Sequence, residues 1–177
     1  MRRDQLEHLI RASGAILGED AVIVIGSQAI LASRIDGLPE IVTRSIEADI
    51  LPLDDPGETK ATLVEGSIGE GSLFQESFGV YAQGVGQGTA RLPDGWRERL
   101  VPLVTDNTRG VTGLCLEPHD LCVAKLLAGR PKDIAYVRAL LEAGIVHGGL
   151  VQARLRDTAA TPEERQRATA RGGLRDR

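Results

Sequence analysis

The chain has 177 residues, a length that suits one domain with at most a small helical addition. Hydrophobic residues make up 42% and charged residues 26%, which are ordinary values for a soluble globular protein. Aromatic residues make up only 3%, so the core must be aliphatic. The net charge of −4 argues against a strong general attraction of the whole molecule for nucleic acid.

The cysteine content and the N-terminal sequence indicate the compartment. Cys115 and Cys122 have no metal-ligand spacing with the three histidines, and two isolated thiols fit a reducing compartment. The N-terminal stretch MRRDQLEHLIRASG lacks the long apolar run of a signal peptide, and no apolar stretch approaches transmembrane length. We therefore predict a cytoplasmic protein that does not associate with a membrane.

The first two thirds of the chain predict a mixture of helices and strands. Residues 21–25 are apolar on both faces and rich in β-branched side chains, which predicts a buried strand. Residues 45–51 alternate apolar and polar side chains, which predicts a strand with one buried face. The other predicted elements are a first helix ended by Gly18, helices over 28–33, 58–65 and 72–78, strands over 79–85, 100–104 and 111–116, a loop over 34–43, and turns over 52–57 and 92–96.

The last third of the chain is predicted to be helical. One helix begins at Glu117–Pro118 and ends at Gly129, and the next begins at Pro131 and ends at Gly144. Helical character resumes from His147, and the sequence Thr-Pro-Glu-Glu at 161–164 predicts the capped start of a final polar helix. We interpret the arginines of the last stretch as a solvated, frayed tail: Arg165, Arg167, Arg171, Arg175 and Arg177. The alternative is that they form a local basic face for a nucleic-acid partner.

Two acidic residues on one predicted strand are the first candidates for chemistry. Glu47 and Asp49 are two positions apart, so their side chains point to the same face a few ångströms apart. Carboxylates this close repel each other unless a cation lies between them, and Mg²⁺ prefers a pair of carboxylates plus substrate phosphates. Gly26–Ser27, at a strand-to-helix turn, offers backbone N–H groups for a phosphate. The alternative is a solvated strand face beside an ordinary glycine turn.

Two stretches together resemble a known family. The stretch IGSQAILASR…TRSIEADILPL resembles the first motif of nucleotidyltransferases of the DNA polymerase beta superfamily. Arg44–Ser45 before the acids, and the later stretch LEPHDLCVAKLLAGRPKDIAYVRALLEAGIV, are similar to the branch that contains the abortive-infection and Men-type toxin nucleotidyltransferases and their uncharacterised bacterial relatives. The resemblance spans roughly residues 20–146. It implies an α+β fold, with a small mixed-sheet nucleotidyltransferase core over 1–116 packed by helices, and a helical segment over 117–177 packed on that core as one compact domain.

The resemblance also implies roles for individual residues. Glu47 and Asp49 would bind Mg²⁺ or Mn²⁺, and a nucleoside triphosphate would be the substrate. Lys125 would neutralise triphosphate charge, and Asp133 would orient that lysine or act as a base. An ion pair that merely ties two helices together is the alternative for Lys125 and Asp133. The residues implied in nucleotide binding are Gly26, Ser27, Arg44, Ser45, Arg130 and Lys132.

Two departures from the family pattern bear on activity. Glu47 stands where the family usually has Asp, and the strand that carries a third carboxylate in many members shows Gln83 here. No spacing selects a substitute for that third acid among Asp54, Asp55, Glu70 and Glu76.

The expected function is nucleotidyl transfer to an acceptor hydroxyl on RNA, a small molecule or a protein, with an antitoxin-like protein as a further partner. One alternative is a catalytically weak or inactive module of the same fold that binds a nucleotide or a partner protein. The other is a purely structural αβ domain whose acids are solvated.

Overall fold

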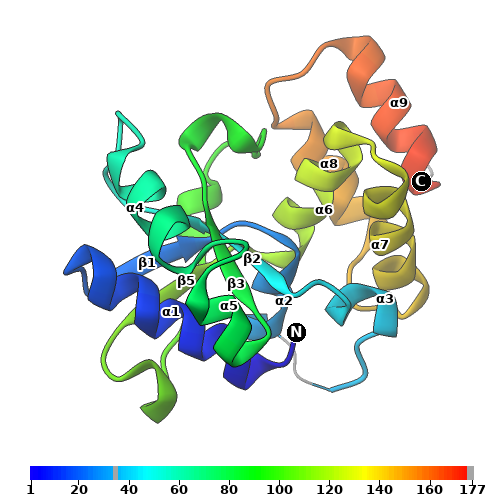
Figure 1. Ribbon diagram of the computed structural model, residues 1–177. Coiled ribbons are helices and arrows are strands. Elements are labelled where there is room, and N and C mark those ends of the chain that lie inside the picture. The colour runs from blue at the N-terminus through cyan, green and yellow to red at the C-terminus, as the bar shows by residue number, and fades with distance from the viewer. Residues whose placement is uncertain (34–35, 175–177) are drawn as a thin grey trace.

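A five-stranded mixed sheet forms the centre of the N-terminal part (Figure 1). The computed structural model describes residues 1–33 and 36–174. The strands lie in the order β3-β2-β1-β5-β4. β1 runs antiparallel to β2 and parallel to β5, β3 is parallel to β2, and β4 is antiparallel to β5. The strand bounds are Ala21–Val24 for β1, Glu47–Leu51 for β2, Tyr81–Gly84 for β3, Val101–Leu103 for β4 and Thr112–Cys115 for β5.

The five predicted strands are therefore confirmed, with ends trimmed by one or two residues. In β1, Val22, Ile23 and Val24 are fully buried, as expected for a central strand apolar on both faces. In β2, Ala48 and Ile50 are buried while the two acids between and beside them are half-buried on the opposite face. The alternation thus places the acids where a ligand can reach them.

Helices of the N-terminal part cover the sheet, and short helical turns connect its strands. α1 (Arg3–Leu17) ends in a left-handed Gly18 cap, as predicted, and it packs against α4 and the sheet. α4, α5 and α1 lie together on one side of the sheet in Figure 1. The α-helices of this part, besides α1, are α2 (Ile30–Ser33), α3 (Glu40–Thr43), α4 (Thr59–Ile68) and α5 (Leu73–Phe78). Its 3-10 turns are η1 (Ser27–Ala29), η2 (Gln87–Thr89), η3 (Trp96–Arg99) and η4 (Asp106–Thr108).

Two connections near β1 differ from the prediction. The helix expected over 28–33 is divided into the 3-10 turn η1 and the single α-turn α2, because the Ala29 amide closes a tight bond to the carbonyl of Gly26 at 3.0 Å. The predicted loop over 34–43 contains the one-turn helix α3, which follows an extended Pro39. Arg34 and residue 35, also in that predicted loop, lie outside the described residues.

Up to residue 174, where the described part of the chain ends, the C-terminal segment forms four helices, as predicted. β5 ends at Cys115 and α6 begins at Pro118, so the change in architecture falls at the predicted boundary. The helices are α6 (Pro118–Ala128), α7 (Pro131–Glu142), α8 (Gly148–Arg156) and α9 (Pro162–Gly172). In Figure 1 they form the part of the molecule to the right of the sheet. That residues 1–116 and 117–177 fold as one unit stays a prediction.

The frayed tail predicted for the arginines is wrong for residues 165–171. These residues belong to α9, which packs on α6 and α7. Thr161 caps α9 by accepting from the Glu164 amide, Ala168 is fully buried, and Arg171 donates to the carbonyl of Leu126 at 3.2 Å. Arg175 and Arg177 lie outside the described residues.

The core is aliphatic, as the composition predicted. Leu6, Leu9 and Ile10 of α1 pack fully buried in one cluster with the strands of the sheet. Within the described ranges, Tyr136 is the one aromatic side chain among the buried apolar residues. No helix in the described part of the chain is long and apolar enough to cross a membrane.

Candidate active site

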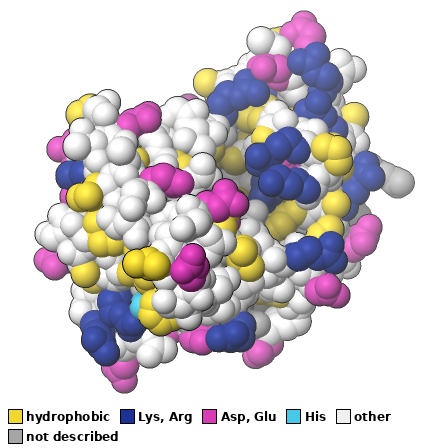
Figure 2. Space-filling view, viewed as in Figure 1, with side chains coloured by type: hydrophobic (Ala, Val, Ile, Leu, Met, Phe, Trp, Pro, Cys, Tyr) yellow, Lys and Arg dark blue, Asp and Glu magenta, His cyan; other side chains and the backbone are white. Residues whose placement is uncertain are grey.

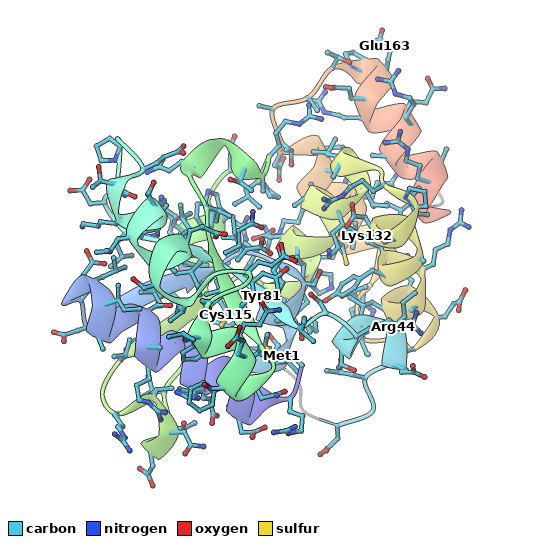
Figure 3. All side chains as sticks on the ribbon, in the orientation of Figure 1. Met1, Arg44, Tyr81, Cys115, Lys132 and Glu163 are labelled. Carbon is cyan, nitrogen blue, oxygen red and sulfur yellow. The ribbon has the colours of Figure 1, made fainter. Side chains whose placement is uncertain are left out.

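A cavity of about 1070 Å³ lies between the sheet and the helices α6 and α7. In Figure 3, Tyr81 is labelled on the sheet side, and Arg44 and Lys132 are labelled on the helical side. The structure brings together all ten residues that the sequence singled out, although their chemical roles stay predictions. The ten lining residues are Gly26, Ser27, Arg44, Ser45, Glu47, Asp49, Lys125, Arg130, Lys132 and Asp133.

The acidic pair lies at the sheet side of this cavity. Burial first, and then the negative charge of Glu47, raise the pKa of Asp49 from 3.8 to about 6, although the charges of Lys125 and Arg130 oppose the shift. Tyr81 donates from its hydroxyl to Oε2 of Glu47 at 3.1 Å. Burial and the charge of Glu47 raise the pKa of Tyr81 to about 12, so this hydroxyl keeps its proton. The two acids thus repel each other, as expected for a pair that needs a cation.

Gly26 is required by the position of the Asp49 side chain. A Cβ built on Gly26 would lie 1.5 Å from Oδ2 of Asp49, so no other residue fits here without moving the carboxylate. The φ angle of Gly26 is −84°, which any residue adopts. A glycine is therefore needed here because it has no side chain, and not because of its backbone conformation. The amide of Ile25 also donates to the backbone carbonyl of Asp49 at 3.1 Å. The glycine turn and the acidic pair are therefore one structural unit.

The donor set at this unit fits a hard divalent cation. Two carboxylates supply oxygen ligands, and the shared burial of like charges is relieved when a cation binds. Gln83 is paired in register with Asp49 on the neighbouring strand and also lines the cavity. Across the described residues, no group of three His, Cys, Asp or Glu side chains is arranged to hold a metal. The site therefore offers a divalent cation two carboxylates as ligands, and the other ligands of the cation would come from a substrate or from water.

The candidates for a substitute third acid lie away from this cavity. Asp54, Asp55, Glu70 and Glu76 are not among its lining residues. Asp55 instead accepts a hydrogen bond from the amide of Ala61 at 2.8 Å, at the start of α4.

Lys125 reaches the glycine turn from α6. Its Nζ atom lies 2.8 Å from Oγ of Ser27 and 3.2 Å from Oδ1 of Asp133, and it stands 4.4 Å from the centre of the Tyr136 ring. Burial lowers the pKa of Lys125, and the nearby charge of Asp133 opposes this. The lysine is thus a buried ammonium held beside the turn.

Asp133 is the buried centre of the elbow between α6 and α7. Gly129 takes a left-handed φ of 68° at the end of α6, and Pro131 begins α7. Arg130 donates to Asp133 from Nε at 2.5 Å. Burial alone would raise the pKa of Asp133, but the hydrogen bond from Arg130 and the charge of Lys125 hold it below its ordinary value. The ion pair between Lys125 and Asp133 is present, and the roles of Asp133 in orienting the lysine or acting as a base stay predictions.

Further cations surround the cavity. Five basic side chains and three carboxylates line it, an excess of two positive charges (5 − 3). Figure 2 shows Lys and Arg side chains gathered over the part of this face that α6 to α9 form. Arg44 forms an exposed pair with Glu40, and Arg91 forms one with Glu164 at 2.9 Å. Lys132 also lines the cavity, and it forms no ion pair with any residue in the described part of the chain, unlike the other four basic lining residues.

Ser45 stabilises the backbone at the start of β2. Its Oγ accepts a hydrogen bond from the amide of Glu47 at 3.1 Å. The Arg44–Ser45 step therefore fixes where the acidic strand begins, besides lining the cavity.

Comparison with known protein families gives one match. The matching family is described as "Nucleotidyltransferase of unknown function (DUF6036)", and its model covers residues 4–171. The chain belongs to this family. The comparisons with curated proteins and with solved structures gave no significant match. The match spans both the sheet and the four C-terminal helices of this nucleotidyltransferase-family chain. It names no branch, so the resemblance to the toxin branch stays a prediction.

Sequence reasoning missed several residues of this nucleotidyltransferase-family site. Tyr136 lies three positions after Asp133, on the same face of α7, and that helical spacing was the available signal. Arg91 and Thr89 come from the glycine-rich connection around η2, where no local pattern indicates that the chain folds back onto the cavity. Gln83 was noted only as a missing acid.

Proposed function

We propose that this protein transfers a nucleotidyl group from a nucleoside triphosphate to an acceptor hydroxyl, in a reaction that depends on Mg²⁺ or Mn²⁺. The observation that carries the proposal is the packing of the Asp49 carboxylate into the space that Gly26 leaves open, beside Glu47 and inside a cavity with excess positive charge. This arrangement supports a cation site and a phosphate site at one place. Membership of a nucleotidyltransferase family supports the reaction class.

Glu47 and Asp49 are the residues that would hold the metal. A bound divalent cation would supply charge neutralisation for the triphosphate and for the charge that develops on transfer. The two carboxylates must be ionised to bind it, and the raised pKa of Asp49 makes that step dependent on pH.

The remaining lining residues would bind and orient the triphosphate. The backbone amides of the Gly26–Ser27 turn would face the phosphates. Lys132 has no ion pair within the described residues, so its ammonium would be the most available to bind a phosphate. Arg44 and Arg130 would add to the positive field. Lys125 would keep Ser27 in place through the hydrogen bond of 2.8 Å.

A labelling experiment tests this proposal. Purified protein is incubated with Mg²⁺ or Mn²⁺ and each nucleoside triphosphate, labelled at either the α- or the γ-phosphate, together with an RNA, small-molecule or protein acceptor. We expect α-label to be transferred by the wild type and not by Asp49→Ala. Asp55→Asn, at an acid outside the cavity, serves as the matched control. Transfer of γ-label, or equal transfer by wild type and Asp49→Ala, contradicts the proposal.

A second function is favoured by one observation. Gln83 is in register with Asp49 on β3, the strand where the resemblance leads us to expect a third carboxylate, and its neutral side chain supports a module that binds a nucleotide without turnover. This alternative predicts Mg²⁺-dependent nucleotide binding by the wild type, weakened in Asp49→Ala, with no α-label transferred to any acceptor. An antitoxin-like protein remains a proposed partner of either function, to be tested by co-purification with the product of an adjacent reading frame.

A further inference from the structure

Tyr136 is an unusual residue in this core. Its side chain is 3% exposed, and within the described ranges it is the one aromatic among the buried apolar residues. It lies on α7, three positions after Asp133, and it lines the cavity. Its burial leaves it little direct access to a substrate, so its contacts indicate what it does.

The two ends of the Tyr136 side chain contact two different parts of the site. The hydroxyl donates to the backbone carbonyl of Ser27 at 2.7 Å, and the ring lies beneath the Lys125 ammonium at 4.4 Å. Burial raises the pKa of Tyr136 well above its ordinary value, so the hydroxyl keeps the proton that it donates. One side chain of α7 thus contacts both the glycine turn and the buried lysine.

Ser27 and Lys125 are each held by more than one contact. Ser27 is bound at its side chain by Lys125 and at its backbone by Tyr136. The ammonium of Lys125 has three N–H donors, and it has three neighbours that can take them: Oγ of Ser27, Oδ1 of Asp133 and the face of the Tyr136 ring. Both Asp133 and Tyr136 come from one face of α7, so this face determines where the ammonium and the turn lie relative to each other.

We infer that Tyr136 is a positioning residue, which fixes the Gly26–Ser27 turn and the Lys125 ammonium in one arrangement before a nucleotide arrives. It acts through these two groups and not on the reacting atoms. The inference rests on the proposed function in so far as the turn binds nucleotide phosphates, while the positioning itself is a property of the protein without ligand. The inference also explains why α7 has a buried aromatic residue, whereas the other buried apolar residues of the described ranges are not aromatic.

Two substitutions separate the two contacts. Tyr136→Phe keeps the ring beside Lys125 and removes only the hydroxyl, whereas Tyr136→Leu removes the ring as well. Thr158→Val is the matched control, because Thr158 is also buried and donates its hydroxyl to a backbone carbonyl, that of Arg154 at 2.8 Å, but it does not line the cavity.

Spectroscopy of the protein without ligand tests the positioning directly. The chain has three lysines, Lys60, Lys125 and Lys132, so the spectrum of ¹³Cε-labelled lysine is simple to assign. We expect a ring-current shift on the Lys125 signal that persists in Tyr136→Phe and disappears in Tyr136→Leu. The amide ¹⁵N signal of Gln28, which follows the Ser27 carbonyl, should shift in Tyr136→Phe and not in Thr158→Val. An unchanged Gln28 signal in Tyr136→Phe, or an unchanged Lys125 signal in a folded Tyr136→Leu, overturns the inference.

Nucleotide affinity gives the functional readout. The probes are the α,β-methylene triphosphates of adenosine, guanosine, cytidine and uridine with Mg²⁺, which cannot transfer a nucleotidyl group. We expect Tyr136→Phe to raise the Kd roughly fivefold, the effect of about one buried hydrogen bond, and Thr158→Val to leave it unchanged. Equal affinity in Tyr136→Phe and wild type overturns the inference. If the wild type binds none of the four probes, the proposed function fails, and the spectra of the ligand-free protein still decide the role of Tyr136.

Discussion

The Asp49 carboxylate occupies the volume that a side chain at Gly26 would need, with Oδ2 1.5 Å from where a Cβ would lie. This relationship explains why a glycine stands in the turn that follows β1, the strand next to the acidic strand. It also explains why the two motifs belong together, because antiparallel pairing of β1 and β2 places the acid against the turn.

Gly26→Ala should destabilise the protein by about 1–3 kcal/mol, the usual cost of overpacking a filled site. The reason is the clash with Asp49, so the same substitution should cost clearly less in an Asp49→Ala background. Urea unfolding of the four proteins in this double-mutant cycle measures the coupling. Gly88→Ala is the control, since Gly88 lines the cavity but has open space around its Cβ position. Additive effects of Gly26→Ala and Asp49→Ala would contradict this explanation.

The stability of the metal-free protein should fall as pH rises from about 4 to above 6. Burial and Glu47 raise the pKa of Asp49 to about 6, so in this window the folded protein holds a proton that the unfolded chain has released. The stabilisation is complete below about pH 4 and lost above pH 6, with a size of about 3 kcal/mol. Urea unfolding in EDTA at pH 4.5 and 7.5 measures it. Asp49→Asn should remove this part of the slope, and an equal slope in both proteins would be evidence against the assignment.

Stabilisation by Mg²⁺ or Mn²⁺ should show the opposite dependence on pH. The cation competes with the proton on Asp49, so its affinity should weaken as pH falls below 6. At 100-fold the dissociation constant, bound metal should add about 2.7 kcal/mol to the free energy of unfolding. Thermal unfolding at pH 7.5 and 5.0 with and without metal measures this, with Glu47→Gln expected to reduce the shift. A metal-induced shift that is the same in Glu47→Gln and wild type would place the ion elsewhere.

Lys125→Met should destabilise the protein by about 3 kcal/mol, because it removes one cation from the buried Asp133 carboxylate. The matched control is Lys60→Met, which breaks the more exposed pair with Glu19 and should cost less than about 1 kcal/mol. The comparison is made by urea unfolding at pH 7.5. Similar losses in the two variants would show that the Lys125–Asp133 pair contributes little to stability.

Much of the fold followed from local patterns. The β-branched run of β1 and the alternation in β2 predicted two strands and their faces, and Gly18, Gly129 and Pro131 marked helix boundaries that the structure confirms. These signals work because strand faces and helix caps depend on neighbours in sequence. The division of residues 28–33 into η1 and α2 did not follow, because it depends on a tight turn that packs against Asp49.

The candidate site was only partly readable from the sequence. Glu47, Asp49 and the Lys125 to Asp133 stretch carry motif spacing, and they converge on one cavity. Arg91 reaches the same cavity from a glycine-rich connection that a salt bridge ties to α9, a contact between residues far apart in sequence. The contact of Tyr136 with Ser27 is likewise long-range, joining α7 to the end of β1. Such contacts are set by how the helical segment packs on the sheet, which no local pattern encodes.

The central claim is that Glu47, Asp49 and the Gly26–Ser27 turn form one site for a cation and a triphosphate. Anomalous diffraction from crystals grown with Mn²⁺ and an α,β-methylene nucleoside triphosphate tests it most directly. The account predicts an anomalous peak between the carboxylates of Glu47 and Asp49, in contact with a phosphate that lies on the turn. A manganese ion bound away from both carboxylates, or a triphosphate bound outside this cavity, would contradict it.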